Sequence, residues 1–224
     1  IPSIVASVKV EIFSDLVCPW CFIGKRRFER AVESLRADGL AHDLEVVVRP
    51  YQLDPTAPTN ETTPVAIAYA KKFGGPEKAA AILRHVTEVA AADGITFNMD
   101  VALRANTLAA HRLLAYVEAK HGSRAQMDVN EAIMNAYFRD GRDIADHAVL
   151  ADCATVVGCE TQDVIEMLES DAYRDDVAEW LAVAADNGIT AVPTFIIDDR
   201  WSIPGAQDTE MFERVLRRML TQPS

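Results

Sequence analysis

The chain has 224 residues, half of them hydrophobic, and carries a formal net charge of −12. This length and apolar content allow a sizeable core and exclude global disorder, while the acidity disfavours nucleic acid and anionic membranes as partners. No apolar stretch approaches the roughly 20 residues that cross a bilayer. The opening, IPSIVASVKVEIF, lacks the features of a signal peptide, so we expect a cytoplasmic protein or a chain that begins after processing.

Residues 8–14, VKVEIFS, read as a strand that ends just before the segment Cys18-Pro-Trp-Cys21. From Cys18 to about Leu35 the apolar residues recur on one helical face, and Asp38-Gly39 ends the pattern. Residues 44–53, LEVVVRPYQL, predict a second strand followed by a turn-rich boundary. This β-α-β opening is long enough for a parallel crossover.

The middle of the chain changes character. Residues from about 62 to 169 are rich in Ala, Leu, Glu and Arg, and glycine-containing breaks divide them into four or five helices with no convincing strand. Residues 171–187 then predict a helix with Gly188 at the C′ position. The segments AVPTFIID and WSIPG predict a hairpin, and residues 208–220 predict a last helix with Asp208 as N-cap.

Removal of the helical middle leaves a small α/β unit. We therefore predict an α/β fold with an inserted all-helical domain, divided as 1–58, 59–169 and 170–224. The first and third ranges form one unit, and the second is the insertion.

Four cysteines are too few for a disulfide-built secreted scaffold, so the close pair needs another explanation. At a helix N-terminus, unsatisfied N–H groups and the helix dipole favour thiolate over thiol. Pro19 suits the first turn, and residues three apart there have Cα atoms roughly 5–5.5 Å apart, within the range of a disulfide. We predict that Cys18 is the exposed attacking thiol and that Cys21, one turn deeper, resolves the mixed disulfide.

Two other interpretations of the pair are weaker. A zinc site would need a second pair, for which only Cys153 and Cys159 are available, so we expect no metal. A purely structural disulfide that closes a four-residue loop would constrain little.

The segment GITAVPTF, residues 188–195, is the second indication. If the two α/β parts pack together, Val192-Pro193 would lie beside Cys18, and a cis bond there would let the Val192 backbone pair with an extended substrate. An ordinary trans proline at the start of a strand is the alternative.

With both motifs placed, the chain resembles the DsbA family of thiol–disulfide oxidoreductases, in its FrnE-like branch. The likeness covers nearly the whole chain. It is carried by SDLVCPWCFIGKRRFE, NTLAAHRLLAY, AYFRDGRDIADHAVLADCA, AVPTFIID and IPGAQ. It implies a thioredoxin-like fold with a helical insertion.

The resemblance also implies residue roles. Cys18 would be the nucleophile, Cys21 the resolving cysteine and Pro193 the cis-proline, with Val192 and Thr194 beside it in the substrate-binding loop. Asn106 and His111 match a helix that covers the active-site cleft; a satisfied helix histidine is the favoured reading of His111. The best-known members carry a histidine between the cysteines, whereas this chain has Trp20, so we expect a less oxidising pair.

Basic residues follow the motif on the same helix. Arg26, Glu29, Arg30 and Glu33 fall at i, i+3, i+4 and i+7, which is typical of a solvated, ion-paired face. Lys25 lies on the side of Cys18 and could tune its thiolate or attract an acidic small thiol.

The other two cysteines lie in LADCATVVGCETQD, residues 150–163. If Gly158 is C′ in a Schellman ending, Cys159 is C″ and Cys153 lies close enough for a disulfide. Two buried cysteines that act as small hydrophobes are the alternative. A hypothesis is that this pair exchanges electrons with Cys18 and Cys21.

We expect a disulfide oxidoreductase that acts on protein or small-molecule thiols, with no cofactor except, at most, a thiol such as glutathione as co-substrate. A kappa-type glutathione transferase or isomerase is one alternative, although such enzymes use a single serine or cysteine. A non-enzymatic holdase that binds extended peptides is the other.

Overall fold

The protein is described here by a computed structural model, which covers residues 8–41, 44–59, 61 and 63–221. The residues before Val8, on which part of the expected location rests, lie outside this range. Within it, no helix combines the length and apolar character needed to cross a membrane.

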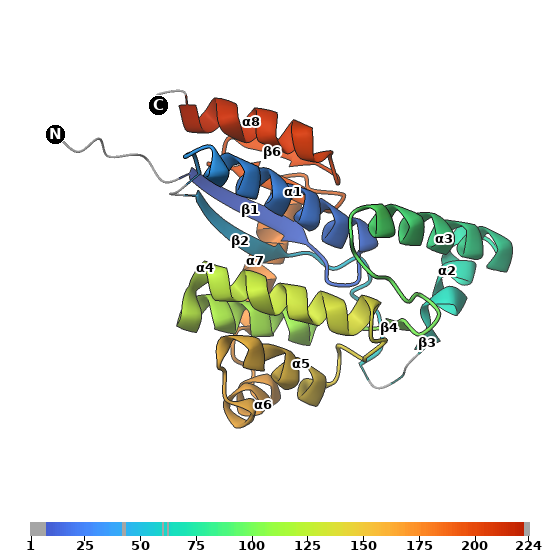
Figure 1. Ribbon diagram of the computed structural model, residues 1–224. Helices are drawn as coiled ribbons and strands as arrows, with labels where there is room; N and C mark the ends of the chain where they lie inside the picture. Colours follow the sequence, from blue (N-terminus) through green and yellow to red (C-terminus); the bar gives the residue numbers. More distant parts are fainter. Residues whose placement is uncertain (1–7, 42–43, 60, 62, 222–224) are drawn as a thin grey trace.

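A four-stranded mixed sheet forms the centre of the molecule (Figure 1). Its order is β2-β1-β5-β6, where β1 spans Val8–Ser14, β2 Leu44–Pro50, β5 Thr194–Ile197 and β6 Trp201–Pro204. Strand β1 is parallel to β2 and antiparallel to β5, and β5 and β6 form the predicted hairpin. The parallel opening of the chain and the return of its C-terminal part to the same sheet are therefore confirmed.

Helices cover both faces of this sheet. Val10 and Ile12 belong to the main core with α1 (Pro19–Ala37) and α8 (Thr209–Thr221), which pack together. Phe13 points the other way and packs with Ala184 of α7 (Arg174–Asp186). Successive side chains of β1 point to opposite faces of the sheet, so one face packs against α1 and α8 and the other against α7.

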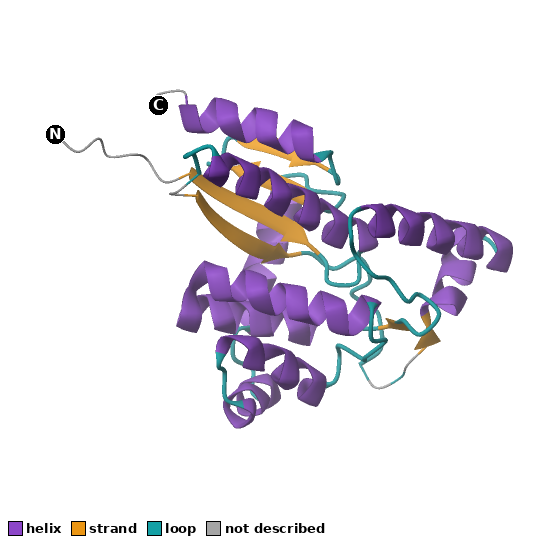
Figure 2. Cartoon of the chain, viewed as in Figure 1, coloured by secondary structure: helices purple, strands orange, loops and turns teal. Residues whose placement is uncertain are grey.

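The helical middle contains α2 (Val65–Phe73), α3 (Pro76–Ala92), α4 (Leu108–Phe138), α5 (His147–Ala154), a 3₁₀ turn (Thr155–Val157) and α6 (Thr161–Glu169). The sequence predicted no strand in this region, and this was wrong, because the region contains one pair of short strands. Strands β3 (Thr63–Pro64) and β4 (Leu103–Arg104) pair antiparallel, apart from the main sheet (Figure 2). Two-residue strands are too short to show an alternating pattern in the sequence.

Helix α4 is two helical segments joined at Gly122, whose φ of 85° and ψ of 174° are not helical. The Gln126 side chain donates to Glu118 at 3.2 Å. Residues eight apart on one straight helix would be roughly 12 Å apart along its axis. The chain therefore turns back at Gly122, which is one of the glycine-containing breaks predicted in the helical middle.

The second segment of α4 covers the edge of the sheet at β2. The Gln126 amide accepts from the Val48 N–H at 2.7 Å and donates to the Val48 carbonyl at 3.1 Å. It therefore satisfies both backbone groups of an edge residue, as a neighbouring strand would.

Arg112 of α4 binds the end of α6 and the segment that leads from it to α7. The buried Arg112 guanidinium donates to the carbonyls of Met167, Leu168, Ser170 and Ala172, at distances between 2.6 and 3.2 Å. The predicted helix from residue 171 begins instead at Arg174, because the chain bends here and Tyr173 takes a left-handed φ of 61°.

The fold class is confirmed: a thioredoxin-like α/β unit with a helical insertion. One continuous hydrophobic cluster runs through both parts, because Phe22 of α1 packs against Phe97 and Phe138 of the insertion. The division at residues 58/59 and 169/170 stays a prediction, and the insertion shares the core of the unit that it interrupts.

Candidate active site

Cys18 lies at the end of the short loop that connects β1 to α1. It is the N-cap of the helix, with extended backbone, and its carbonyl accepts from the Cys21 N–H at 3.1 Å. Pro19 occupies the first turn, where its missing N–H costs nothing, and that turn contains no acidic residue. The dipole and free N–H groups of α1 therefore act on Cys18 without a nearby opposing carboxylate on the helix.

Cys21 lies one turn deeper and is 1 % exposed. Burial raises the pKa of its thiol well above the ordinary value, and the adjacent Cys18 sulfur raises it further. Hydrogen bonds from the Ser14 hydroxyl and the Asp15 amide act in the opposite direction. Cys21 is therefore a thiol that keeps its proton unless a group beside it takes the proton away.

The loop before β5 faces Cys18. The Val192–Pro193 peptide bond is cis, and the Cys18 thiol donates to the Val192 carbonyl at 3.8 Å. Thr194 follows as the first residue of β5, paired with Phe13 of β1. The predicted loop residues and the two cysteines are thus brought together, although 174 positions separate Cys18 from Val192.

Cys18 was predicted to be exposed, and this is wrong for the structure: the residue is 4 % exposed. The Val192–Pro193 loop lies on one side of it. Tyr69 of α2 is also near Cys18, and burial together with this neighbouring thiol raises the pKa of Tyr69 to about 12. A partner must displace part of this cover to reach the sulfur.

Comparison with known proteins agrees with this geometry. The model of the DSBA-like thioredoxin domain matches residues 9–217. The chain belongs to this family.

Two relatives resemble the DSBA-like chain over nearly its whole length. The protein YwbO of Bacillus subtilis (strain 168) is 30 % identical, over 94 % of this chain and 96 % of its own. The crystal structure of a probable DsbA oxidoreductase from Streptomyces coelicolor has a TM-score of 0.87 and 30 % identity, over 97 % of this chain and 92 % of its own.

A more distant likeness shows the fold alone. The cytosolic disulfide reductase DsbM from Pseudomonas aeruginosa, solved with GSH, has a TM-score of 0.66 and 17 % identity, over 96 % of this chain and all of its own.

Asn106 and His111 bind the insertion to the backbone that leaves β2. The Asn106 amide donates to the Ala57 carbonyl at 2.8 Å, and its oxygen accepts from the Leu108 N–H at the start of α4. His111 Nε2 lies 3.0 Å from the Tyr51 carbonyl. Both side chains are buried, and their expected contact with substrate stays a prediction.

Trp20 and Lys25 both contact residues of the insertion. Trp20 is 36 % exposed, and its ring lies 6.1 Å from that of His85 of α3. The buried Lys25 ammonium lies 2.7 Å from Glu29 and 2.6 Å from Glu131 of α4. Its charge is already engaged by two carboxylates, so its expected effect on Cys18 stays a prediction.

The charged face of α1 is ion-paired, as its spacing predicted, with Arg30 and Glu33 exposed, and the insertion adds partners that the spacing does not show. Arg26 donates to Glu131 at 2.5 Å, and Arg30 donates to Asp93 at 3.2 Å. Partners from the insertion, distant in sequence, are therefore added to the pairs along the helix, where Arg26 lies 3.9 Å from Glu29.

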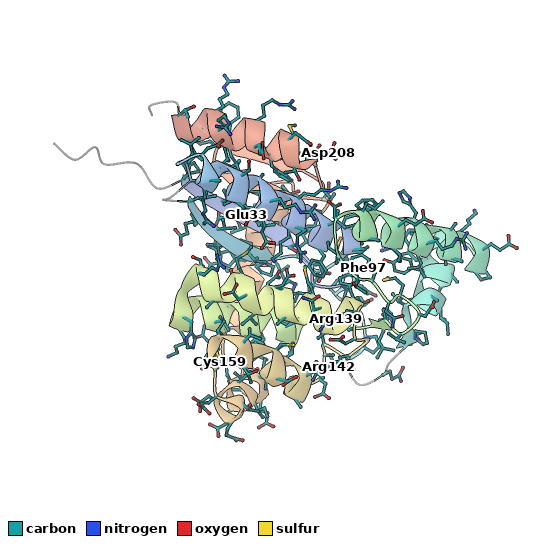
Figure 3. The ribbon with its side chains drawn as sticks, viewed as in Figure 1. Glu33, Phe97, Arg139, Arg142, Cys159 and Asp208 are labelled. Carbon is teal, nitrogen blue, oxygen red and sulfur yellow. The ribbon has the colours of Figure 1, made fainter. Side chains whose placement is uncertain are left out.

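The second pair of cysteines adopts the predicted turn. Gly158 has a left-handed φ of 79°, and the N–H groups of Gly158 and Cys159 bond to Thr155 and Ala154 as in a Schellman motif. Both cysteines are free thiols, and Cys159 Sγ lies 3.5 Å from His121 Nε2. Cys159 is at the far side of α4 from the sheet, because α4 packs on β2 and on α5 (Figure 3).

The sequence reasoning missed three residues: Asp15 and Tyr69, which are near Cys18, and Tyr137, which is near both of them. Asp15 stands three positions before Cys18, and that short spacing was the available signal. The two tyrosines come from α2 and α4, so nothing in the sequence connects them with the motif. Among the described residues, no group of three or more His, Cys, Asp or Glu could hold a metal ion.

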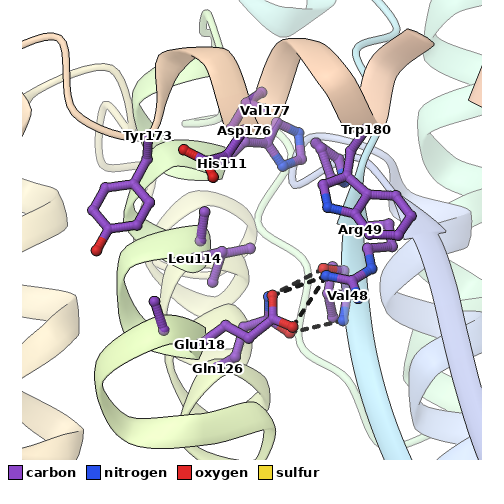
Figure 4. Close-up of a pocket in the computed structure, with 13 residues that line it drawn as sticks. Val48, Arg49, His111, Leu114, Glu118, Gln126, Tyr173, Asp176, Val177 and Trp180 are labelled. Atoms are coloured by element: carbon purple, nitrogen blue, oxygen red, sulfur yellow. Dashed lines mark hydrogen bonds and ion pairs between the residues drawn. The ribbon is translucent and has the colours of Figure 1, made fainter. Parts of the chain in front are cut away.

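A separate cavity of about 400 Å³ lies between β2, α4 and α7 (Figure 4). Arg49 crosses it, bonded to Glu118 at 2.9 Å and stacked 3.8 Å from the Trp180 ring centre. Of the predicted site residues only His111 lines this cavity, so it is distinct from the thiol site.

Proposed function

We propose that the chain is a thiol–disulfide oxidoreductase in which Cys18 attacks and Cys21 resolves. The Cys18 thiolate bonds to one sulfur of a partner disulfide, and the other sulfur leaves as a thiolate. Cys21 then loses its proton and attacks the Cys18 sulfur, which releases the second partner thiolate. The chain is oxidised by two electrons and the partner is reduced; the reverse sequence oxidises a partner dithiol.

One observation carries this proposal: two thiols one turn apart, of which only the outer is an N-cap facing the carbonyl of a cis-proline loop. Cys18 lies at the positive end of the dipole of α1, whereas Cys21 lies deeper, where burial raises the pKa of its thiol. The difference in environment gives the two sulfurs different roles.

The partner is a protein or small-molecule thiol or disulfide. Glutathione is a candidate co-substrate, because the structurally similar DsbM was solved with GSH. A cytoplasmic location belongs to the same proposal and is in keeping with that cytosolic relative. The net direction follows from the reduction potential of the pair relative to its surroundings.

The test is to trap the intermediate. A Cys21→Ser variant should accumulate partners on Cys18 as mixed disulfides, which run as extra bands on a non-reducing gel and disappear with reductant. Cys18→Ser is the matched control and should trap nothing. A Cys21→Ser protein that stays unmodified when the wild type reduces the same disulfide would contradict the assigned roles.

The alternatives would give different outcomes. Glutathione conjugation that survives in Cys21→Ser would indicate the transferase, and peptide holding that survives loss of both thiols would indicate the holdase. The relay through Cys153 and Cys159 is left out of the proposal, because α4 separates them from the sheet.

A further inference from the structure

Arg27 of α1 joins two segments that are far from it in the sequence. Its Nη1 donates to the Ala206 carbonyl at 3.0 Å, 179 positions away, and its Nε donates to Asp93 Oδ2 at 2.8 Å, 66 positions away. The side chain is 18 % exposed. A guanidinium group carries its N–H donors in one rigid plane, so it can hold both partners at once in a fixed geometry.

Ala206 belongs to the loop of residues 205–208, which connects β6 to α8 and contacts Pro193. The N–H of Gly205 donates to the Pro193 carbonyl at 2.7 Å. Pro193 and Ala206 both lie against Gly24 of α1, where a Cβ atom would be 2.9 Å from the proline and 3.3 Å from the alanine. The loop has no regular secondary structure, so its place beside α1 depends on side-chain contacts such as the one from Arg27.

The Pro193 loop is in turn part of the cover over the reactive thiol. The Val192 carbonyl accepts from the Cys18 thiol at 3.8 Å, and Cys18 is 4 % exposed. Arg27 is therefore connected to the thiol through two loops, first that of Ala206 and then that of Pro193.

Asp93 ties the position of Arg27 to the insertion. It is the C-cap of α3 and is 8 % exposed. Its Oδ1 accepts from Arg30 at 3.2 Å, and its carbonyl accepts from Arg30 Nη2 at 2.9 Å. Helix α3 also carries His85, whose ring lies 6.1 Å from that of Trp20 between the two cysteines. The bonds of Asp93 are charge-assisted and largely buried, so they hold α3 against α1 more firmly than an exposed ion pair would.

The neighbouring basic residues of α1 make a different contact. Lys25 and Arg26 lie 2.6 and 2.5 Å from the carboxylate of Glu131 in α4. Arg26 therefore joins α1 to the insertion as Arg27 does, but at α4 instead of α3. Arg27 also lies 3.5 Å from Asp208, whose side chain is 81 % exposed, and such an exposed pair contributes little.

We propose that Arg27 is a positioning residue for the reaction: it holds the Pro193 loop against Cys18 through Ala206, and Asp93 holds Arg27 in place. The docking of α3 on α1 thus sets how closely the loop covers the thiol. Arg27 itself takes no part in the transfer of electrons. The inference rests on the proposed function, in which Cys18 attacks a partner disulfide beside this loop.

The variant Arg27→Gln should change two rates in opposite directions. Glutamine cannot bind Ala206 and Asp93 together, so the loop should move away from α1. The kcat/KM for reduction of a protein disulfide should fall by about 10-fold, because small displacements at a reacting centre cost up to about 100-fold. Alkylation of Cys18 by iodoacetamide in the reduced protein should become at least about threefold faster, because the thiol loses cover.

Mass spectrometry assigns the label to each cysteine. Labelling of Cys153, which is buried in α5, should stay at the wild-type rate, and this distinguishes a local opening at the loop from general unfolding. Faster labelling of both cysteines would overturn the inference, because the variant would then act through stability alone.

Two further variants grade the effect. Arg27→Lys keeps the charge but not the planar group that binds two partners, so both of its rates should lie between those of the wild type and Arg27→Gln. Asp93→Asn keeps the bond from Arg27 to Ala206 but weakens the hold on Arg27, so it should change both rates in the same directions by a smaller factor. Arg26→Gln is the matched control and should leave both rates unchanged.

Wild-type values of both rates in Arg27→Gln would overturn the inference, and so would the same changes in Arg26→Gln. If Arg27→Gln does not fold, wild-type rates in Arg27→Lys and Asp93→Asn overturn it instead. A wild-type protein that reduces no disulfide would refute the proposed function, whereas the labelling of Cys18 would still test the hold of Arg27 on the loop.

Discussion

Gly24 lies on the side of α1 that faces the loop of Pro193. A Cβ atom at this position would lie 2.9 Å from Pro193 Cγ and 3.3 Å from Ala206. The absent side chain therefore allows the loop to approach the helix, and with it the Val192 carbonyl to approach Cys18.

The variant Gly24→Ala should separate reactivity from stability. Alanine favours the helix by roughly 0.5–1 kcal/mol, but its methyl group must push Pro193 away from the thiol. We expect a folded protein whose rate of disulfide reduction falls by about 10-fold to 100-fold. The activity is measured as the steady-state rate at which a protein disulfide is reduced, and circular dichroism checks that the variant is folded.

Ser34→Ala, on the same helix and away from the loop, is the control and should keep the wild-type rate. A Gly24→Ala enzyme with full activity would show that the distance between loop and helix does not matter for turnover.

At the scale of elements, β2 is an edge strand of the sheet, and a side chain of the insertion binds its free edge. Gln126 satisfies the Val48 N–H and carbonyl through its side-chain amide. No pattern in the sequence marks this glutamine, because its partner lies 78 positions away.

Gln126→Met has nearly the same length but cannot make either hydrogen bond. Because two buried backbone groups lose their partner, we expect the free energy of unfolding to fall by about 2–4 kcal/mol. Urea denaturation measures the loss, and faster hydrogen exchange of the Val48 amide locates it. Gln162→Met is the control, since Gln162 is exposed and bonds to the exposed Glu166, and a similar loss in both variants would contradict the explanation.

The elements that the sequence predicted well are those whose signal is local. The alternation in residues 8–14, the proline after Cys18 and the glycine at 158 each act through immediate neighbours, and the structure has a strand, a helix start and a Schellman turn there. The burial of Cys18 and the real partners of Arg26 depend on the insertion, so local patterns could not give them.

At the scale of the whole molecule, a thiol far from the active site connects stability to pH. Burial raises the pKa of Cys153 from 9.0 to about 11. Between these values the folded protein keeps the proton and the unfolded chain loses it. The free energy of unfolding therefore falls as the pH rises through this interval.

Cys153→Ala removes this contribution. With reductant present, the wild type should lose about 1–2 kcal/mol more than the variant as the pH rises through this interval, after allowance for solvent screening. Urea unfolding at several pH values measures the difference between the two slopes. Cys21 is also buried, but it is present in both proteins, so its contribution cancels in the comparison. If the free energy of unfolding fell equally with pH in both proteins, the raised pKa would not belong to Cys153.

The overall fold could be predicted because the order of the patterns indicated an α/β unit with a helical insertion, and the resemblance carried by CPWC and Val-Pro-Thr implied a thioredoxin-like arrangement. The candidate site was predicted only in its sulfurs and its proline loop. Tyr69 becomes relevant only because α2 of the insertion brings it near Cys18, which is a property of the tertiary structure.

The four bonds from Arg112 act as a cross-link between segments more than fifty positions apart. Secreted proteins often use disulfides for such links, and those are opened by reductants. Under the proposed function, the protein would meet both reductants and oxidants. Hydrogen bonds from a guanidinium group react with neither, so this link between α4 and the segment after α6 would not depend on the redox conditions.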